Sequence, residues 1–262
     1  MNRIVVKVGG HALDRLDAAS PVLEGLAADV RSIRDTTSVV IVHGGGPQIA
    51  SLLERVGLVS QFLYGLRVTD SETMEYVAMA LGLVNQRVTA ALVRAGLDAV
   101  GLSGVDGALV KATARGGRLG RVARDIRVDA QLVTDLLERG WTPVVGPVAS
   151  DAAGELLNCN ADTVAGTIAA ALNADALVLL SDVDQLRGDR DDPASALTSV
   201  SGADVRSMMV EGSIRDGMIP KMQAALDAVD AGAARVVLAN GTRPHALLGV
   251  LNGTIPSTEV KR

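Results

Sequence analysis

The stretch VVIVHGGGPQIA, residues 39–50, runs from an apolar strand pattern through three glycines and a proline into a helical pattern. One glycine would be enough for a tight turn. Three in succession leave a concave patch of bare backbone N–H groups ahead of a helix N-terminus, where an anion is stabilised. The stretch therefore predicts a strand, an anion-binding loop and a helix, although it matches neither G-x-x-x-x-G-K-[ST] nor G-x-G-x-x-G.

The same alternation extends along the whole chain. Apolar runs typical of buried parallel strands occupy 4–8, 39–42, 99–102, 143–145, 176–180 and 236–239. Helical periodicity occupies about 20–34, 46–56, 71–95, 129–139, 161–173, 203–211 and 218–231. This βαβ series predicts a three-layer αβα sandwich around an open, mainly parallel central sheet, with ligands bound at the carboxyl ends of its strands.

Three polar segments interrupt this series. Segments 59–69 and 107–128 have the turn residues of hairpins laid over the sheet, and they are candidate lids. Segment 187–195, RGDRDDPAS, is predicted to be a mobile loop near a binding site. The arginines between Arg115 and Arg127 could attract an acidic partner, but spaced cations on an exposed hairpin are the stronger interpretation.

Composition limits the classes of function. At 262 residues and 26.9 kDa, the chain can form one large core or two closely fused lobes. No signal peptide or membrane span is indicated, so we expect a cytoplasmic protein. A net charge of −5 argues against nucleic acid and favours a small-molecule substrate. The single Cys159 is interpreted as a small buried hydrophobe, and the three histidines lack metal-ligand spacing.

Two lysines stand out because the chain has only four lysines among its 25 basic residues. Lys7 in IVVKVGG and Lys221 in GMIPKMQAA are flanked by apolar residues. Each could be a functional cation, or a lysine that snorkels from the end of an element.

Two further motifs carry polar side chains at the starts of predicted helices. In NCNADTVAG, Asn158, Asn160 and Asp162 place hydrogen-bonding groups and one carboxylate at a strand-to-helix turn. Asp162 could position lysines in a phosphate site, or it could simply complement the helix dipole. Arg67 in GLRVTD could capture a carboxylate or form a structural ion pair, and the motif alone does not choose between them.

Taken together, these motifs resemble those of the N-acetylglutamate kinases of the amino acid kinase superfamily. KVGG, VIVHGGGPQI, GLRVTD, AVGLSGVDG, NCNADTVAG, LLSDV and DGMIPKMQAA stand in the order seen in that family, from residue 3 to about 253. The resemblance implies transfer of a phosphoryl group from ATP to the side-chain carboxylate of N-acetyl-L-glutamate, an early step of arginine biosynthesis. The nearest alternative is the kinase of carrier-linked α-aminoadipate in lysine biosynthesis, and a catalytically inactive regulator is a weaker one.

The resemblance also implies roles for individual residues. Lys7 and Lys221 would contact the transferring phosphoryl group, with Asp162 organising both lysines. Asn160 would lie beside the reacting group, and Arg67 and Asn158 would hold the α-carboxylate and the amide of the substrate. Backbone amides for phosphates and substrate would come from Gly9, Gly10, Gly44 and Gly45, and ATP would bind around Asp182 and residues 207–221.

The chemistry agrees with this resemblance. A carboxylate is ionised at pH 7, so the reaction needs no general base, and no His–carboxylate pair recurs in these motifs. Two unit charges 4 Å apart repel by roughly 4 kcal/mol at an effective dielectric near 20, so cations must stand between the two substrates. Two lysines, Mg²⁺ held by ATP oxygens and water, and aimed amides would meet that need.

The resemblance implies an organisation as well. Residues 1–174 would form the acetylglutamate-binding and dimerisation lobe, and residues 175–262 the ATP-binding lobe. The arginine-inhibited hexamers of the family carry a helix before the first strand, so a homodimer is expected here. Three places depart from the family pattern: Asp184-Gln185-Leu186 replaces a segment with a glycine, Asp216 stands where many relatives have glycine, and Cys159 replaces a commoner valine.

Overall fold

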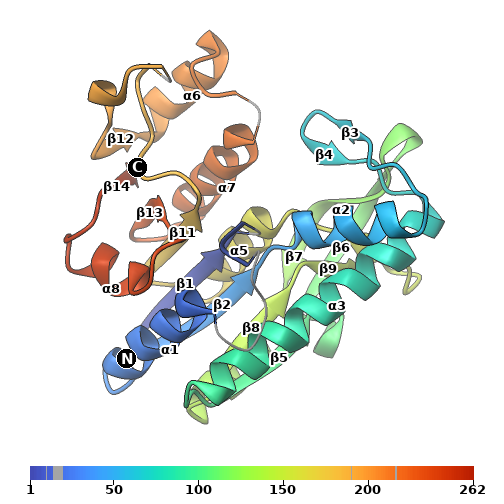
Figure 1. The fold of residues 1–262 in the computed structure, drawn as a ribbon, viewed down its shortest axis with the longest axis horizontal. Coiled ribbons are helices and arrows are strands. Elements are labelled where there is room, and N and C mark those ends of the chain that lie inside the picture. The colour runs from blue at the N-terminus through green and yellow to red at the C-terminus, as the bar shows by residue number, and fades with distance from the viewer. Residues whose placement is uncertain (10, 14–19, 190, 216) are drawn as a thin grey trace.

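The computed structural model describes residues 1–9, 11–13, 20–189, 191–215 and 217–262, and its centre is a single sheet (Figure 1). The strand order is β12-β14-β13-β11-β1-β2-β8-β5. The strands are parallel except at the β13–β14 pair, so β14 and its parallel neighbour β12 run against the others. They span Asn2–Val8 (β1), Thr37–His43 (β2), Ala99–Ser103 (β5), Thr142–Gly146 (β8), Ala176–Ser181 (β11), Ser199–Ser201 (β12), Val236–Asn240 (β13) and Ser257–Lys261 (β14). All the strands predicted from apolar runs lie in this sheet.

Helices cover both faces of the sheet. They span Pro21–Ile33 (α1), Gly46–Arg55 (α2), Ser71–Arg94 (α3), Gln131–Glu138 (α4), Ala161–Ala171 (α5), Gly202–Glu211 (α6), Met218–Asp230 (α7) and Ala246–Leu251 (α8). Side-chain caps begin several of them: Ser20, Asp70 and Asn160 accept from the backbone N–H three residues on. The predicted three-layer α/β sandwich is confirmed.

Alternation along β1 shows how the layers form. Ile4, Val6 and Val8 belong to a hydrophobic core with α1, α3 and α8, whereas Val5 belongs to a second core with α4, α5 and α7. Because successive side chains of a strand point to opposite faces, Lys7 shares the face of Val5. The strand pattern thus directs Lys7 toward α5.

Two hairpins rise from the carboxyl edge of the sheet, and both were expected from the sequence. One pairs Phe62–Leu63 (β3) with Leu66–Arg67 (β4), and the other pairs Val110–Gly116 (β6) with Gly120–Val128 (β7). Strands Val148–Ser150 (β9) and Leu156–Asn158 (β10) close a four-stranded ring with β6 and β7. A lid function for either hairpin stays a prediction.

The hairpins touch each other at one tight contact. The N–H of Arg121 donates to the carbonyl of Thr69 at 2.6 Å. Gly120 has φ +62°, and a Cβ there would stand 2.3 Å from the Thr69 oxygen, so this close approach requires glycine. Within the basic stretch, Arg121 pairs with Glu155 at 2.6 Å and Arg124 with Asp125 at 3.5 Å. Arg115 and Arg118 are exposed, as expected of cations on a hairpin surface.

Helix α3 is the one helix in the described part of the chain that is long and apolar enough to cross a membrane. One side of it is buried against the sheet and α2, through residues that include Val77, Leu81 and Val88. Its other side exposes Met79, Leu83 and Val93. One set of its apolar side chains therefore packs in the core. Met79, Leu83 and Val93 form an apolar stripe that is exposed on the surface.

Asp29 of α1 connects this helix to α8, which packs beside it on the same face of the sheet. Its carboxylate, fully buried, contacts Nδ1 of His245 at 2.7 Å and accepts from the N–H of Leu248 at 3.1 Å. We expect Asp29→Ala to lower the free energy of unfolding by about 1–3 kcal/mol, because it removes a buried carboxylate and leaves the partly buried N–H of Leu248 without its acceptor. Urea unfolding measures the change, and Asp35→Ala, the same substitution at an exposed site, should leave stability unaltered.

Candidate active site

A buried carboxylate between two lysines forms the centre of the site. Lys7 Nζ lies 2.7 Å from Oδ1 of Asp162, and Lys221 Nζ lies 3.9 Å from Oδ2. The side chains of Lys7 and Asp162 are only 5% and 7% exposed, and that of Lys221 is 19% exposed. The three residues predicted as catalytic are thus brought together although they stand far apart in the sequence.

Each of these residues lies at the end of a secondary-structure element. Lys7 is in the penultimate position of β1, beside Val42 of β2 and Leu179 of β11. Asp162 is in the first turn of α5, which Asn160 caps through the N–H of Thr163 at 3.0 Å. Lys221 lies in the first turn of α7. Carboxyl ends of strands and amino ends of helices therefore converge on one point.

The charges alter one another's protonation. Burial by itself raises the pKa of Asp162, but the ammonium groups of Lys7 and Lys221 outweigh it and hold the pKa below its usual value. Burial, together with the neighbouring charge of Lys7, lowers the pKa of Lys221. The carboxylate is therefore ionised at neutral pH and fixes two cations in a site largely shielded from water.

On one side of this centre lies a cavity of about 260 Å³. Its walls come from the loop after β2, the β3–β4 hairpin and the turn between β10 and α5. All the predicted substrate-binding residues line it, namely Gly44, Gly45, Arg67, Asn158 and Asn160, together with Lys7 and Asp162. A small polar molecule placed here would lie against the Lys7–Asp162 pair.

Arg67 is held as a buried cation in the wall of this cavity. Its guanidinium donates to the carbonyl of Gly46 at 3.1 Å and to Oγ of Ser60, and it lies 4.7 Å from the centre of the Phe62 ring. Among the described residues no carboxylate pairs with it, so the structure does not support a structural ion pair. Burial lowers the pKa of Arg67, but an arginine remains charged. Its charge is available to an anionic ligand.

The glycine loops differ from the prediction in one respect. The N–H of Gly9 donates to Leu180 and the N–H of Gly44 donates to Val8, both at 2.9 Å, so these two amides continue the sheet. Gly45 is different, because its N–H has no acceptor among the described residues. A side chain at Gly45 would collide with Leu81, whose Cδ2 would be 2.7 Å from a Cβ there. Gly10 lies outside the described residues.

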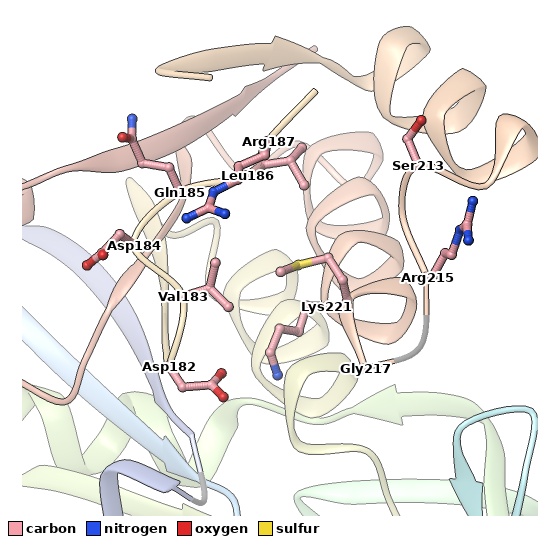
Figure 2. Close-up of a pocket in the computed structure, with 11 residues that line it drawn as sticks. Asp182, Val183, Asp184, Gln185, Leu186, Arg187, Ser213, Arg215, Gly217 and Lys221 are labelled. Carbon is pink, nitrogen blue, oxygen red and sulfur yellow. The ribbon is translucent and has the colours of Figure 1, made fainter. Parts of the chain in front are cut away.

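On the other side of the centre lies a larger cavity of about 570 Å³ (Figure 2). Asp182 and Lys221 stand at the same end of it, and Arg187, Ser213 and Arg215 line other parts of its wall. Predicted residues of the ATP site therefore do surround a cavity. Arg187 comes from the segment predicted to be a loop near a binding site, although Arg190 of that segment lies outside the described residues.

The segment that departs from the family pattern, 184–186, is firmly bound to the edge of the sheet. Asp184 accepts from Asn240 at 3.0 Å and lies 3.5 Å from Arg243. Gln185 donates to the carbonyl of Ser257 at 3.1 Å, and Leu186 is buried. These three residues therefore form a well-anchored part of the wall of the larger cavity. The second departure, Asp216, lies outside the described residues.

Sequence reasoning gave no role to two residues beside the glycine loop. His43 is fully buried, and burial lowers its pKa to about 4. It contacts Asn85 of α3. Two features of the sequence could have pointed to this pair: His43 directly precedes the three glycines, and Asn85 is a polar residue within the apolar helix α3. Cys159, by contrast, is buried as expected, and its burial raises the pKa of the thiol to about 12.

Comparison with known proteins gives consistent matches along the chain. The sequence model of the Amino acid kinase family matches residues 2–240. Acetylglutamate kinase of Symbiobacterium thermophilum is 40% identical over 255 residues, covering 94% of this chain and 86% of that protein. Acetylglutamate kinase of Methanopyrus kandleri is 42% identical over 257 residues, covering 95% and 97%.

Solved structures that superimpose on this chain cover nearly its whole length. A protein of Streptococcus mutans UA159 superimposes with a TM-score of 0.83 at 27% identity, covering 99% of this chain and 98% of that one. Carbamate kinase from Giardia lamblia, bound to AMP-PNP, superimposes with a TM-score of 0.71, covering 100% and 98%. Its identity of 15% means that it is similar in fold alone.

Proposed function

The chain belongs to the amino acid kinase family, and we propose that it is an acetylglutamate kinase, which phosphorylates the side-chain carboxylate of N-acetyl-L-glutamate with ATP in arginine biosynthesis. The family resemblance drawn from the motifs is thereby confirmed. The observation that carries the proposal is the Lys7–Asp162–Lys221 array at the junction of two cavities, one sized for a small anion and the other larger.

The reaction joins two anions and requires no proton. A carboxylate oxygen of acetylglutamate attacks the γ-phosphorus of ATP, the bond from that phosphorus to the β,γ-bridging oxygen breaks, and ADP leaves. The total charge is −6 on both sides, counting ATP as −4, ADP as −3, N-acetylglutamate as −2 and its acyl phosphate, with the free α-carboxylate, as −3. Catalysis therefore depends on position and on cations rather than on a general base.

Residues of the smaller cavity would bind the acceptor. Arg67 would hold the α-carboxylate, Asn158 the acetamido group, and Asn160 would lie beside the reacting carboxylate. The side-chain amide of Asn158 donates to Oγ1 of Thr69 at 3.1 Å, which holds it at the cavity wall. This assignment is supported by the lining of the cavity and by the absence of a carboxylate partner for Arg67 among the described residues.

Lysines at the junction would act on the transferring group. Lys7 reaches the junction from the smaller cavity and Lys221 from the larger one, so an in-line transfer would pass between them. At a distance of 4 Å and an effective dielectric near 20, each cation offsets roughly 4 kcal/mol of repulsion between the substrates. Asp162 would keep both ammonium groups in place.

Mg²⁺ is expected to enter the site with the nucleotide. Among the described residues, no group of three or more His, Cys, Asp or Glu side chains is placed to hold a metal ion. Such a group is not required, because Mg²⁺ in kinase sites keeps several waters and is bound largely through substrate phosphates. When bound, it would neutralise part of the charge on the phosphates.

The two-lobe division and a cytoplasmic homodimer complete the proposal. Of the residues that the structure describes, those lining the smaller cavity lie between 7 and 162 and those lining the larger one between 182 and 221, which favours lobes of 1–174 and 175–262. Both lobes share one sheet through the β1–β11 pair. The apolar stripe of α3, with Met79 and Leu83 exposed, would be covered by the same helix of a second copy.

The proposal is tested by measuring ADP release with MgATP and each of three acceptors: N-acetylglutamate, free glutamate and α-aminoadipate. Hydroxylamine traps any acyl phosphate as a hydroxamate. We expect turnover and hydroxamate with N-acetylglutamate alone. Turnover only with glutamate or α-aminoadipate, or none with any acceptor, would contradict the assigned substrate.

The assignment of Arg67 makes a separate kinetic prediction. We expect Arg67→Lys to raise KM for N-acetylglutamate by about 10- to 100-fold with little change in KM for ATP, because an ammonium cannot form the paired hydrogen bonds of a guanidinium. Steady-state kinetics with each substrate varied in turn measures this. Arg124→Lys, on the exposed hairpin, is the matched control, and equal KM values for the two variants would refute the assignment.

A further inference from the structure

The imidazole of His43 joins the glycine loop to helix α3. His43 is the last residue of β2 and is fully buried. Its Nδ1 lies 2.8 Å from the carbonyl oxygen of Gly44, and its Nε2 lies 3.0 Å from Nδ2 of Asn85. Both ring nitrogens therefore have a polar neighbour, and the direction of each hydrogen bond depends on which nitrogen carries the proton.

Two backbone carbonyls settle that direction. Nδ2 of Asn85 also lies 3.1 Å from the carbonyl oxygen of Leu102 and 2.9 Å from that of Val144. Carbonyl oxygens only accept, so the atom facing them must be the NH₂ group of the amide. The NH₂ group has two hydrogens to share among these carbonyls and Nε2 of His43, and its nitrogen cannot accept a hydrogen bond. A proton on Nε2 would therefore face the NH₂ hydrogens, so the imidazole proton must be on Nδ1.

With its proton on Nδ1, His43 donates to the carbonyl of Gly44. Across a trans peptide bond the N–H of Gly45 points opposite to that carbonyl. A peptide between two glycines would otherwise rotate easily, since glycine has few forbidden conformations. The hydrogen bond thus fixes the direction of the N–H of Gly45, an amide that has no acceptor among the described residues.

The backbone of Gly101 and Gly146 packs closely against the side chains of Asn85 and His43, which restricts both side chains to the observed orientation. A Cβ on Gly101 would lie 2.3 Å from Oδ1 of Asn85, and a Cβ on Gly146 would lie 3.1 Å from Nε2 of His43. Burial keeps the imidazole neutral at pH 7, because the pKa of His43 is lowered to about 4. The neutral ring with one defined tautomer is therefore the resting form.

We propose that His43 is a positioning residue, whose Nδ1–H tautomer is set by Asn85 and aims the N–H of Gly45 at the oxygen anion between the two substrates. The inference rests on the proposed function. Gly45 and Lys7 line the same cavity, so the aimed amide and the ammonium group act on the same charge. His43 touches neither substrate.

Nuclear magnetic resonance tests the tautomer without any activity. The chain has three histidines, and ¹⁵N shifts distinguish a protonated from an unprotonated ring nitrogen. In ¹⁵N-histidine-labelled wild type at pH 7, we expect His43 to show a protonated Nδ1 and an unprotonated Nε2. His245→Asn and His43→Asn assign the signals by their disappearance. A protonated Nε2 on His43 would overturn the proposal.

Two variants separate positioning from packing. His43→Asn places an amide N–H near the position of Nδ1, whereas His43→Gln places its amide near Nε2 and removes the bond to Gly44. We expect kcat of His43→Gln to fall about 10²-fold, with KM for ATP unchanged and with His43→Asn retaining most of kcat. Equal kcat values for the two variants, whether both low or both normal, would refute the positioning role.

Thermal unfolding of His43→Asn and His43→Gln shows whether a change in kcat is accompanied by a loss of stability. His245→Asn is the control and should keep full activity. The kinetics uses whichever acceptor the wild type turns over. Failure of the proposed function would appear as inactive wild-type protein, whereas failure of this inference would appear as the wrong tautomer in the same preparation.

Discussion

Replacing Lys7 by methionine is expected to lower kcat by about 10³-fold while KM for ATP changes little. The ammonium group is buried beside Asp162 and faces the smaller cavity, so it is worth more on a developing anion than it would be in water. Methionine keeps most of the side-chain volume and removes only the charge. The measurement is steady-state ADP release with saturating MgATP and N-acetylglutamate.

A matched control comes from the same residue type. Lys261→Met makes the same chemical change at an exposed position, the last residue of β14, and should leave kcat unaltered. Lys7→Arg should not restore activity, because a planar guanidinium does not reproduce the compact point charge of an ammonium group beside Asp162. Activity of Lys7→Met close to that of Lys261→Met would remove Lys7 from the mechanism.

Loss of Lys7 also affects stability, and this must be separated from catalysis. Removing one partner of a buried ion pair costs about 3–5 kcal/mol, because the other charge stays buried. In Lys7→Met only Lys221, at 3.9 Å, still faces Asp162. The double variant Lys7→Met/Asp162→Asn removes both charges and should regain much of the lost stability in urea unfolding, while kcat remains low. Recovery of kcat along with stability would show that Lys7 only supports the fold.

Replacing Asp162 by asparagine is expected to lower kcat by about 10²- to 10³-fold. Asparagine has the same shape but no charge, so the ammonium groups of Lys7 and Lys221 repel each other without a carboxylate between them. At least one of them should then move away or lose its proton. Single-turnover experiments with bound ATP measure the transfer step itself. A wild-type rate of transfer would contradict an organising role for Asp162.

Asp162 also gives the stability of the protein a defined pH dependence. Its folded-state pKa is lowered, so its stabilising contribution is complete above the unfolded value of about 3.9 and is lost as the pH falls through the folded value. Asparagine does not titrate in this range, so Asp162→Asn should lack the loss of stability that protonation of Asp162 causes in the wild type. Unfolding free energies measured between pH 7 and pH 3 should therefore fall less steeply for the variant than for wild type.

Most of the fold could be predicted because buried parallel strands and amphipathic helices have clear periodicities. The elements that were missed are β9, β10, β12, β14 and α8, and β9, β10 and β12 have only three residues each. Strand β14, Ser257–Lys261, alternates buried and exposed residues and is antiparallel to β13, so it lacks the continuous apolar run of the central strands. Helix α8 has six residues, too few for a helical period to be recognised.

By itself the sequence determined the alternation of strands and helices, the glycine loop at the end of β2, and the face of β1 on which Lys7 stands, since these follow from local pattern and from the two-residue period of a strand. Tertiary structure alone decided that Lys7 and Lys221 share Asp162, because their elements meet only when β1, α5 and α7 pack together. It also decided that Arg67 has no carboxylate partner among the described residues, and that His43 is paired with Asn85. The contacts among Lys7, Asp162 and Lys221 and between His43 and Asn85 join residues between 42 and 155 positions apart, and no periodicity of the chain encodes such distances.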